Sequence, residues 1–152
     1  MTRHTIDASE KPLLDIFCDK YLFSIPSYQR PYAWTTEQAD ELLSDISAAC
    51  APTGKIDDAV PYFLGSIVLI KAPQEREADI VDGQQRLTTL TILMCVLRDL
   101  AAADVAPHIH RYVCQIGNPV EGTNDEFRLT PRARDADYFR KHIQASGATS
   151  AL

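Results

Sequence analysis

Apolar residues in this chain alternate between short runs typical of strands and longer periodic patterns typical of helices. Runs at residues 21–25 and 62–70 predict strands, and Pro26 ends the first of them. The 62–70 run is almost continuously apolar, so we expect this strand to be buried on both faces. A charged turn separates it from a short apolar strand at residues 80–81, which predicts that the two strands form a hairpin.

Helical periodicity is clearest in the middle of the chain. Residues 87–103 are apolar nearly all round, which predicts a central, buried helix. Thr35, with Gln38 three residues later, predicts the capped start of an earlier helix. Its buried stripe would consist of Ala39, Leu42, Leu43, Ile46 and Cys50. Further elements are predicted at residues 12–17, 105–115 and 132–143 as helices and at residues 127–130 as a short strand.

The length and composition fit one domain with a proper core, since the 152 residues are 45% hydrophobic. We place the domain at residues 11–143, after a loose N-terminus (1–10) and before a small polar tail (144–152). No apolar run approaches the roughly 20 residues that span a bilayer, and no signal peptide precedes the domain. Four separated cysteines without a C-x-x-C motif favour a reduced, cytoplasmic setting. The net charge of -6 means that any nucleic-acid partner must meet a local basic face.

The most informative stretch, residues 80–90, reads IVDGQQRLTTL. A short strand runs into the Asp82-Gly83 turn, and Asp82 with Gln85 matches a capping box at the start of a helix. Free amides and the positive end of the helix dipole attract phosphate, and Arg86 adds a bidentate donor. The stretch therefore predicts an anion site. The alternative is a well-capped core helix with a surface arginine.

A second unusual stretch, residues 26–34, gathers aromatic rings around an amide and a guanidinium. Tyr28, Tyr32 and Trp34 surround Gln29 and Arg30, and such a mixture is suited to holding a base or a nucleotide. The alternative is a loop whose aromatic rings, Trp34 above all, only anchor it to the core.

Both stretches follow a strand and precede a helix, so we expect them to face one pocket. Arg30 and Arg86 lack an evident acidic partner nearby in the sequence. Two guanidinium groups brought together would repel each other unless an anion lay between them. The sequence therefore predicts a bound anion between these two arginines.

Three motifs, IPSYQRPYAW (25–34), YFLGSIVL (62–69) and IVDGQQRLTTL (80–90), resemble the N-terminal domain of GmrSD-type restriction proteins in order and spacing. That family is related to ParB and sulfiredoxin. The resemblance implies an α+β, ParB/sulfiredoxin-like nuclease-type fold, with a small mixed sheet packed with several helices. It also implies a domain that binds and hydrolyses nucleoside triphosphates in phage defence against modified DNA.

The resemblance assigns the nucleotide site to Asp82, Gly83, Gln84, Gln85 and Arg86. Tyr28, Gln29, Arg30 and Tyr32 would line the same cavity or sense modified DNA. Such proteins usually continue into a helical region and a C-terminal His-Asn-His nuclease domain. This sequence lacks that nuclease motif, so we expect residues 144–152 to mark a truncation point and expect no nuclease activity.

Anhydride hydrolysis depends mainly on positioning and on neutralising charge, usually with Mg²⁺. We expect the backbone amides of Gln84 and Gln85 to cradle phosphate with Arg86, and Arg30 to add a second positive charge. Asp82 would hold a metal-bound water or only cap the helix, and Gln84 or Gln85 would orient the attacking water. Two alternatives stand beside a nucleoside triphosphatase: a non-catalytic sensor of modified DNA, and a purely structural module.

Overall fold

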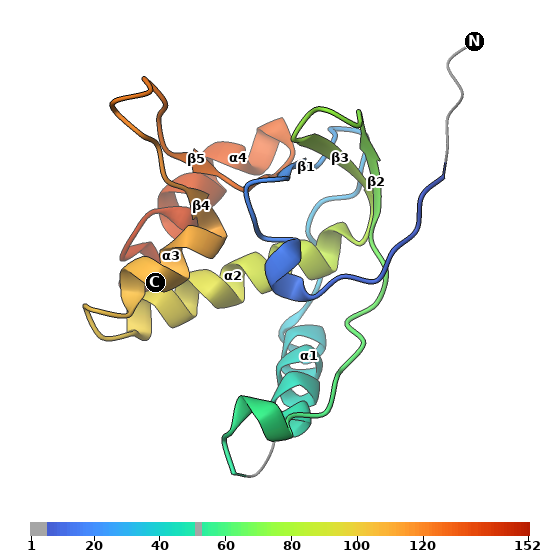
Figure 1. Cartoon of the computed structure of the whole chain (residues 1–152), viewed down its shortest axis with the longest axis vertical. Helices are drawn as coiled ribbons and strands as arrows, with labels where there is room; N and C mark the ends of the chain where they lie inside the picture. Colours follow the sequence, from blue (N-terminus) through green and yellow to red (C-terminus); the bar gives the residue numbers. More distant parts are fainter. Residues whose placement is uncertain (1–5, 51–52) are drawn as a thin grey trace.

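A small mixed sheet forms one side of the core of this α+β domain. The computed structural model describes residues 6–50 and 53–152 (Figure 1), so residues 1–5 of the predicted loose N-terminus lie outside the described part. The strand order is β2-β3-β1-β6, with β1 parallel to both β3 and β6 and β2 antiparallel to β3. The predicted hairpin is therefore confirmed. The strands span Leu22–Ser24 (β1), Val68–Lys71 (β2), Glu77–Asp82 (β3) and Leu129–Thr130 (β6).

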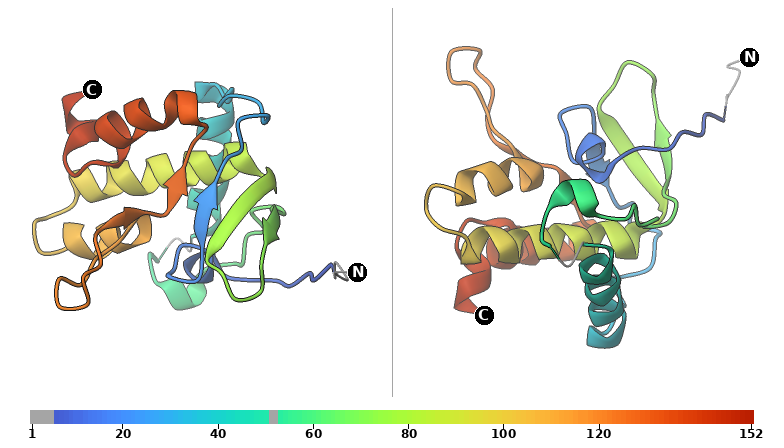
Figure 2. Two further views of the ribbon diagram at one scale, coloured as in Figure 1. Left: turned by 90° about the horizontal axis from the view of Figure 1, so that it is seen from above. Right: turned by 60° about the horizontal axis from the view of Figure 1, so that its bottom comes forward.

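The helices surround a central helix, α2, which spans Gln84–Leu100. In Figure 2, α2 lies between α3 (Ala106–Val113) and the C-terminal helices, while α1 (Thr36–Ala49) projects to one side. The last predicted helix is α4 (Ala133–Phe139), continued by a π-helical segment, Arg140–Gln144. A separate antiparallel pair, β4 (Cys114–Gln115) and β5 (Glu126–Phe127), joins α3 to β6. No helix within the described ranges is long and apolar enough to cross a membrane.

The core lies between the sheet and the first half of α2. Ala78 and Ile80 from β3 are completely buried, and they belong to one apolar cluster with Phe23 of β1 and with Leu87 and Leu90 of α2. The predicted central helix is confirmed. Its buried threonines satisfy their hydroxyls by donating to the carbonyl four residues earlier, as Thr88 does to Gln84 at 2.7 Å.

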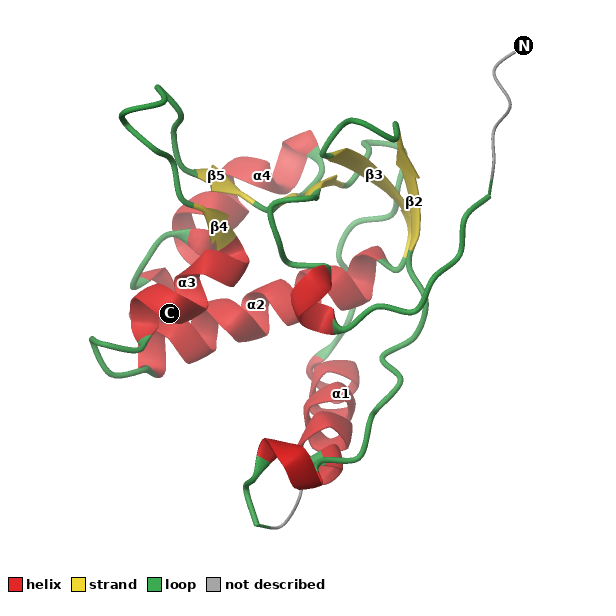
Figure 3. Ribbon diagram, viewed as in Figure 1, coloured by secondary structure: helices red, strands yellow, loops and turns green. Residues whose placement is uncertain are grey.

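The prediction of one long strand over residues 62–70 is wrong. Strand β2 begins only at Val68, and residues 62–67 form a loop, as Figure 3 shows. Gly65 interrupts the run with a positive φ of 102°, and β2 lies at the sheet edge, where Val68 and Ile70 stay 48% and 64% exposed. The exposed residues of β2 alternate with half-buried ones, so only one face of this strand is covered although its sequence is continuously apolar from Val68 to Ile70.

The other predicted elements differ in detail. Helix α1 begins after Thr35, whose backbone N–H donates to Gln38 Oε1 at 2.6 Å, as predicted. Of its predicted stripe, Leu42 is buried, but Leu43 and Cys50 are exposed because the helix projects from the domain. The predicted helix at 12–17 is a single 3₁₀ turn, Leu13–Asp15. The predicted tail includes a 3₁₀ turn, Ala148–Ala151, that contacts α2.

The topology brings several loops to one edge of the sheet, the edge that is formed by the ends of its strands. Because β1, β3 and β6 are parallel, their carboxyl ends meet at this edge, and β2, being antiparallel to β3, begins there. The residues that follow β1, β3 and β6 and those that precede β2 therefore gather on one side, where open α/β sheets bind ligands.

Candidate functional site

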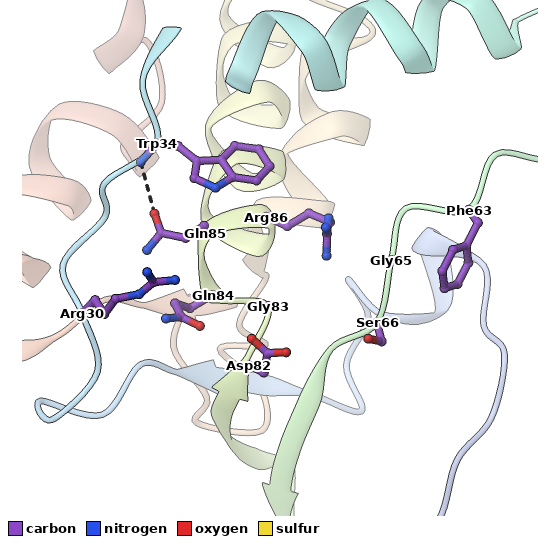
Figure 4. Close-up of a pocket in the computed structure, with 10 residues that line it drawn as sticks. All are labelled: Arg30, Trp34, Phe63, Gly65, Ser66, Asp82, Gly83, Gln84, Gln85 and Arg86. Atoms are coloured by element: carbon purple, nitrogen blue, oxygen red, sulfur yellow. Dashed lines mark hydrogen bonds between the residues drawn. The ribbon is translucent and has the colours of Figure 1, made fainter. Parts of the chain in front are cut away.

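A polar cavity of about 430 Å³ opens at this edge of the sheet (Figure 4). The loop after β1 contributes Arg30 and Trp34 to its lining, and the turn after β3 contributes residues 82–86. Phe63, Gly65 and Ser66, which precede β2, complete it. The two stretches that were expected to face one pocket do so.

Helix α2 begins without a side-chain cap. Its N-cap residue is Gly83, with φ 89°, and no side-chain hydrogen bond caps the helix. The predicted capping box of Asp82 and Gln85 is therefore wrong, because the turn needs a left-handed residue at position 83 and places Asp82 outside the helix. The first intrahelical bond runs from Leu87 N–H to the Gly83 carbonyl at 3.0 Å. The amides of the preceding helical turn, residues 84–86, thus have no intrahelical acceptor.

Gly83 is also fixed by its surroundings. A Cβ at this position would lie 2.6 Å from Ile67 Cγ2 and 3.1 Å from the Ser66 carbonyl oxygen. The strand-to-helix turn therefore passes directly over the segment that leads into β2. This close approach fixes the uncapped helix end, which lines the polar cavity through Gly83.

The side chain of Gln85 holds the loop after β1. Its Oε1 accepts from the backbone N–H of Ala33 at 2.7 Å and of Trp34 at 3.2 Å, and its Nε2 donates to the Pro31 carbonyl at 3.1 Å. Gln85 is buried, and these bonds use both acceptor positions of Oε1 and one of the two N–H groups of Nε2. Because Oε1 already accepts two bonds, Gln85 has its backbone amide and the second N–H of Nε2 left for a ligand, and its predicted role in orienting the attacking water stays a prediction.

Gln84 and Gln29 form a weaker second connection between the same two segments. Gln84 Nε2 donates to Gln29 Oε1 at 3.4 Å, and Gln29 Nε2 donates to the Val81 carbonyl at 3.1 Å. The Gln84 side chain lines the cavity and keeps its own oxygen unbonded within the part of the chain that the structure covers. Of the Gln84 and Gln85 side chains, that of Gln84 is the one whose oxygen has no hydrogen bond from the described residues and can accept from a bound water.

Arg86 and Arg30 line the polar cavity from different elements, α2 and the loop after β1. The Arg86 guanidinium lies against Gly65, where a Cβ would be only 2.5 Å from Nη1. Gly65 therefore makes room for an arginine side chain. Neither Arg30 nor Arg86 has an ion-pair partner among residues 6–50 and 53–152.

Asp82 contributes the carboxylate of the polar cavity, and it is exposed. No hydrogen bond or ion pair from the described residues occupies this carboxylate, so it is free to bind. The structure shows no group of three or more His, Cys, Asp or Glu side chains that could hold a metal, as far as its described residues go. A Mg²⁺ ion fits such a site only when phosphate oxygens and water complete its shell, which is how Mg²⁺ commonly binds.

The aromatic residues predicted to line the cavity divide between three environments. Trp34 lines the polar cavity and also contacts the core. The Tyr32 hydroxyl lies 2.9 Å from Thr89 Oγ1, and the residue lines a neighbouring, more apolar cavity. Tyr28 is 76% exposed and lines neither. Its predicted role in sensing DNA stays a prediction.

Phe63 and Ser66 line the cavity although sequence reasoning did not select them. Both lie in the segment that was predicted to be a buried strand. A hydrogen bond of 2.8 Å from the Tyr62 hydroxyl to Asp45 ties this segment to α1 and raises the pKa of Tyr62. The one sequence signal for the segment was Gly65, a small residue within an apolar run.

Comparison with known families gives one result that covers nearly the whole chain. A family model described as the N-terminal domain of the GmrSD restriction endonuclease matches residues 13–151. A search of curated proteins returned no match. The matched range includes every residue of the polar cavity.

Proposed function

This chain belongs to the family of the GmrSD restriction endonuclease N-terminal domain, and from that premise we propose that its polar cavity binds and hydrolyses nucleoside triphosphates. The observation that carries the proposal is the uncapped N-terminus of α2, with Arg30 and Arg86 unpaired beside it among the described residues. Family membership makes the domain part of a restriction system that acts in phage defence.

The phosphate groups would bind where the positive partial charges gather. The free amides of residues 84–86 and the helix dipole favour an anion at this end of α2. Arg86 would grip the phosphates from the side of Gly65, and Arg30 from the opposite loop. Two arginines and one aspartate leave the lining with a net positive charge, which suits a polyphosphate.

Asp82 would hold Mg²⁺ together with the phosphate oxygens, because its carboxylate is exposed in the cavity and otherwise unoccupied within the described residues. When bound, Mg²⁺ would neutralise charge on the phosphates and so assist anhydride cleavage. Gln84 would orient the attacking water through its free side-chain oxygen. Gln85 would act as a positioning residue, since it fixes the loop that carries Arg30.

Replacing Asp82 by asparagine tests the catalytic part of this proposal. Gly83, not Asp82, is the N-cap residue, so Asp82→Asn should leave the melting temperature unchanged. Mg²⁺-dependent phosphate release should fall about 100-fold, because a charged metal ligand is lost. The matched control is Asp79→Asn, an exposed aspartate on the same strand that lines neither cavity. Wild-type turnover in Asp82→Asn would exclude Asp82 as a metal ligand, and no release by the wild type would refute hydrolysis by this domain.

A further inference from the structure

One wall of the polar cavity is a strap, residues 62–66, that runs from the region of α1 toward β2. Within the described residues, no backbone hydrogen bond joins this strap to another segment. Its one hydrogen bond within the same ranges runs from the Tyr62 hydroxyl to Asp45 Oδ2 of α1, at 2.8 Å. The half-buried Leu64 adds apolar contacts to the core. One side-chain hydrogen bond thus supplies the polar attachment of this wall.

The strap also supports the Arg86 side chain, which points toward it from the first turn of α2 (Figure 4). The guanidinium lies so close to the Gly65 backbone that a Cβ there would be 2.5 Å from Nη1 and 2.6 Å from Cζ. Arg86 is half-buried and has no ion-pair partner among the residues that the structure describes. A long, flexible side chain without a partner depends on such a surface to restrict its rotamers.

The charges around Tyr62 show that α1, the strap and Arg86 lie within electrostatic reach of one another. The hydrogen bond to Asp45 is the largest cause of the raised pKa of Tyr62, burial and the Asp45 and Glu41 charges add to it, and the Arg86 charge opposes the rise. Asp45 nevertheless forms no ion pair with Arg86. Because Tyr62 donates to Asp45, this carboxylate has a partner on the strap and Arg86 keeps its charge for the cavity.

We propose that Tyr62 and Asp45 are positioning residues: their hydrogen bond ties the strap to α1, and the strap holds the Arg86 guanidinium in the orientation that meets phosphate. This inference rests on the proposed function. A side chain that is restricted before binding loses less entropy when the phosphate binds, so the hydrogen bond raises the affinity. Helix α1 would therefore influence the affinity of a cavity that it does not line.

Calorimetric titration of GTP and ATP, with Mg²⁺ present, tests this inference in variants that remove the hydrogen bond from either side. Tyr62→Phe removes a hydroxyl from a 42% exposed side chain, so the melting temperature should stay near that of wild type. Its affinity for both nucleotides should fall about fivefold. Asp45→Ala should weaken binding to the same extent, and the double variant should bind no more weakly than either single variant, because all three lack the same bond.

The direction of the Asp45→Ala effect is informative. Removing a negative charge near the cavity would by itself strengthen the binding of a polyanion, whereas loss of the tie weakens it. The matched control is Asp40→Ala, which makes the same change of charge at an exposed aspartate of α1. Asp40 has no ion pair within the described residues, and its replacement should leave the affinity at or slightly above that of wild type. In an Arg86→Ala background, Tyr62→Phe should have no further effect on affinity, because the residue that it positions is absent.

The outcomes separate this inference from the proposed function. Wild-type affinity in Tyr62→Phe would overturn the positioning role and leave nucleotide binding standing. Tighter binding by Asp45→Ala would also overturn it, since Asp45 would then compete with phosphate for Arg86. So would a loss of affinity in Tyr62→Phe that persists in the Arg86→Ala background, because the strap would then act without Arg86. Failure of the wild type to bind either nucleotide would overturn the proposed function and this inference together.

Discussion

Gln85 connects the two segments that form the polar cavity, and it does so with both ends of its side-chain amide. It accepts from two backbone N–H groups of the loop after β1 and donates to the Pro31 carbonyl. Arg30 has no such anchor of its own within the described part of the chain. Its position in the cavity therefore depends on a glutamine that would not touch the phosphates with its side chain.

Gln85→Ala should destabilise the domain by about 2 kcal/mol, because two partly buried N–H groups and one carbonyl would lose their partners. Urea unfolding measures this change, and triphosphate affinity should fall in the same variant as the loop loosens. Gln74→Ala is the control, since Gln74 lies exposed in the turn between β2 and β3. A Gln85→Ala protein as stable as the wild type would show that the loop is held by other contacts.

The same residues show what the sequence could and could not predict. The Asp82-Gly83 pair correctly indicated a tight turn before a helix, because glycine accommodates a positive φ. Whether Asp82 or Gly83 is the N-cap residue depends on that φ angle, and the residue types alone do not reveal it. The partners of Gln85 lie more than 50 residues away, so no local pattern could assign them.

At the scale of elements, the end of α2 holds the C-terminal segment. Arg98 is 1% exposed and donates to the carbonyls of Gln144 at 2.6 Å and Ala145 at 2.8 Å. Its neighbour Asp99 accepts from the backbone N–H of Gly147 at 2.9 Å and from the N–H and hydroxyl of Thr149 at 3.0 and 2.6 Å. The residues predicted to be a polar tail are thus tied to the central helix by an adjacent pair of charges.

This arrangement predicts a pH-dependent stability. Burial alone would raise the pKa of Asp99, but hydrogen bonds from Arg98, Thr149 and Gly147 outweigh it and hold that pKa well below its usual range. A carboxylate whose pKa is lower in the folded than in the unfolded state stabilises the folded state at pH values above the unfolded-state pKa. This stabilisation is lost as the pH falls toward the folded-state pKa. Asp99→Asn should therefore lower the free energy of unfolding by about 3 kcal/mol at neutral pH. The difference from wild type should shrink as the pH falls below about 4.

Urea unfolding of wild type and Asp99→Asn between neutral pH and strongly acidic pH measures this difference. Asp137→Asn serves as the control, because its carboxylate is 93% exposed and should show almost no difference at any pH. A gap between wild type and Asp99→Asn that stays constant on acidification would contradict the assigned role of the Asp99 charge.

Elements with a strong internal pattern were predicted well. The all-round apolar helix and the hairpin of β2 and β3 are present. The 62–70 strand failed because an apolar run does not distinguish a buried strand from an exposed edge strand and its preceding loop. The sequence did not indicate that Arg98 and Asp99 bind the C-terminal segment, because charged residues at the end of a helix usually lie on the surface.

At the scale of the whole molecule, the site is a consequence of strand direction. Three parallel strands end at one sheet edge, and an antiparallel strand begins there. Four segments that lie far apart in the sequence thereby meet around the two cavities. Sequence reasoning anticipated that Arg30 and Arg86 would face one cavity, because both follow strands. It missed Arg132 and Asp135 at the cavity beside it, because the place of β6 next to β1 depends on pairing between distant residues.

The central claim is that an anion binds between Arg30 and Arg86 at the uncapped end of α2. Calorimetric titration of GTP and ATP with Mg²⁺ into wild type, Arg30→Ala and Arg86→Ala tests it most directly. Each variant should bind about tenfold more weakly or worse, because it loses a charge-assisted contact to phosphate, while its melting temperature stays near that of wild type. Arg134→Ala, an exposed arginine on α4 that lines neither cavity, should bind within about twofold of wild type. Wild-type affinity in both cavity variants, or no binding by the wild type itself, would contradict the account.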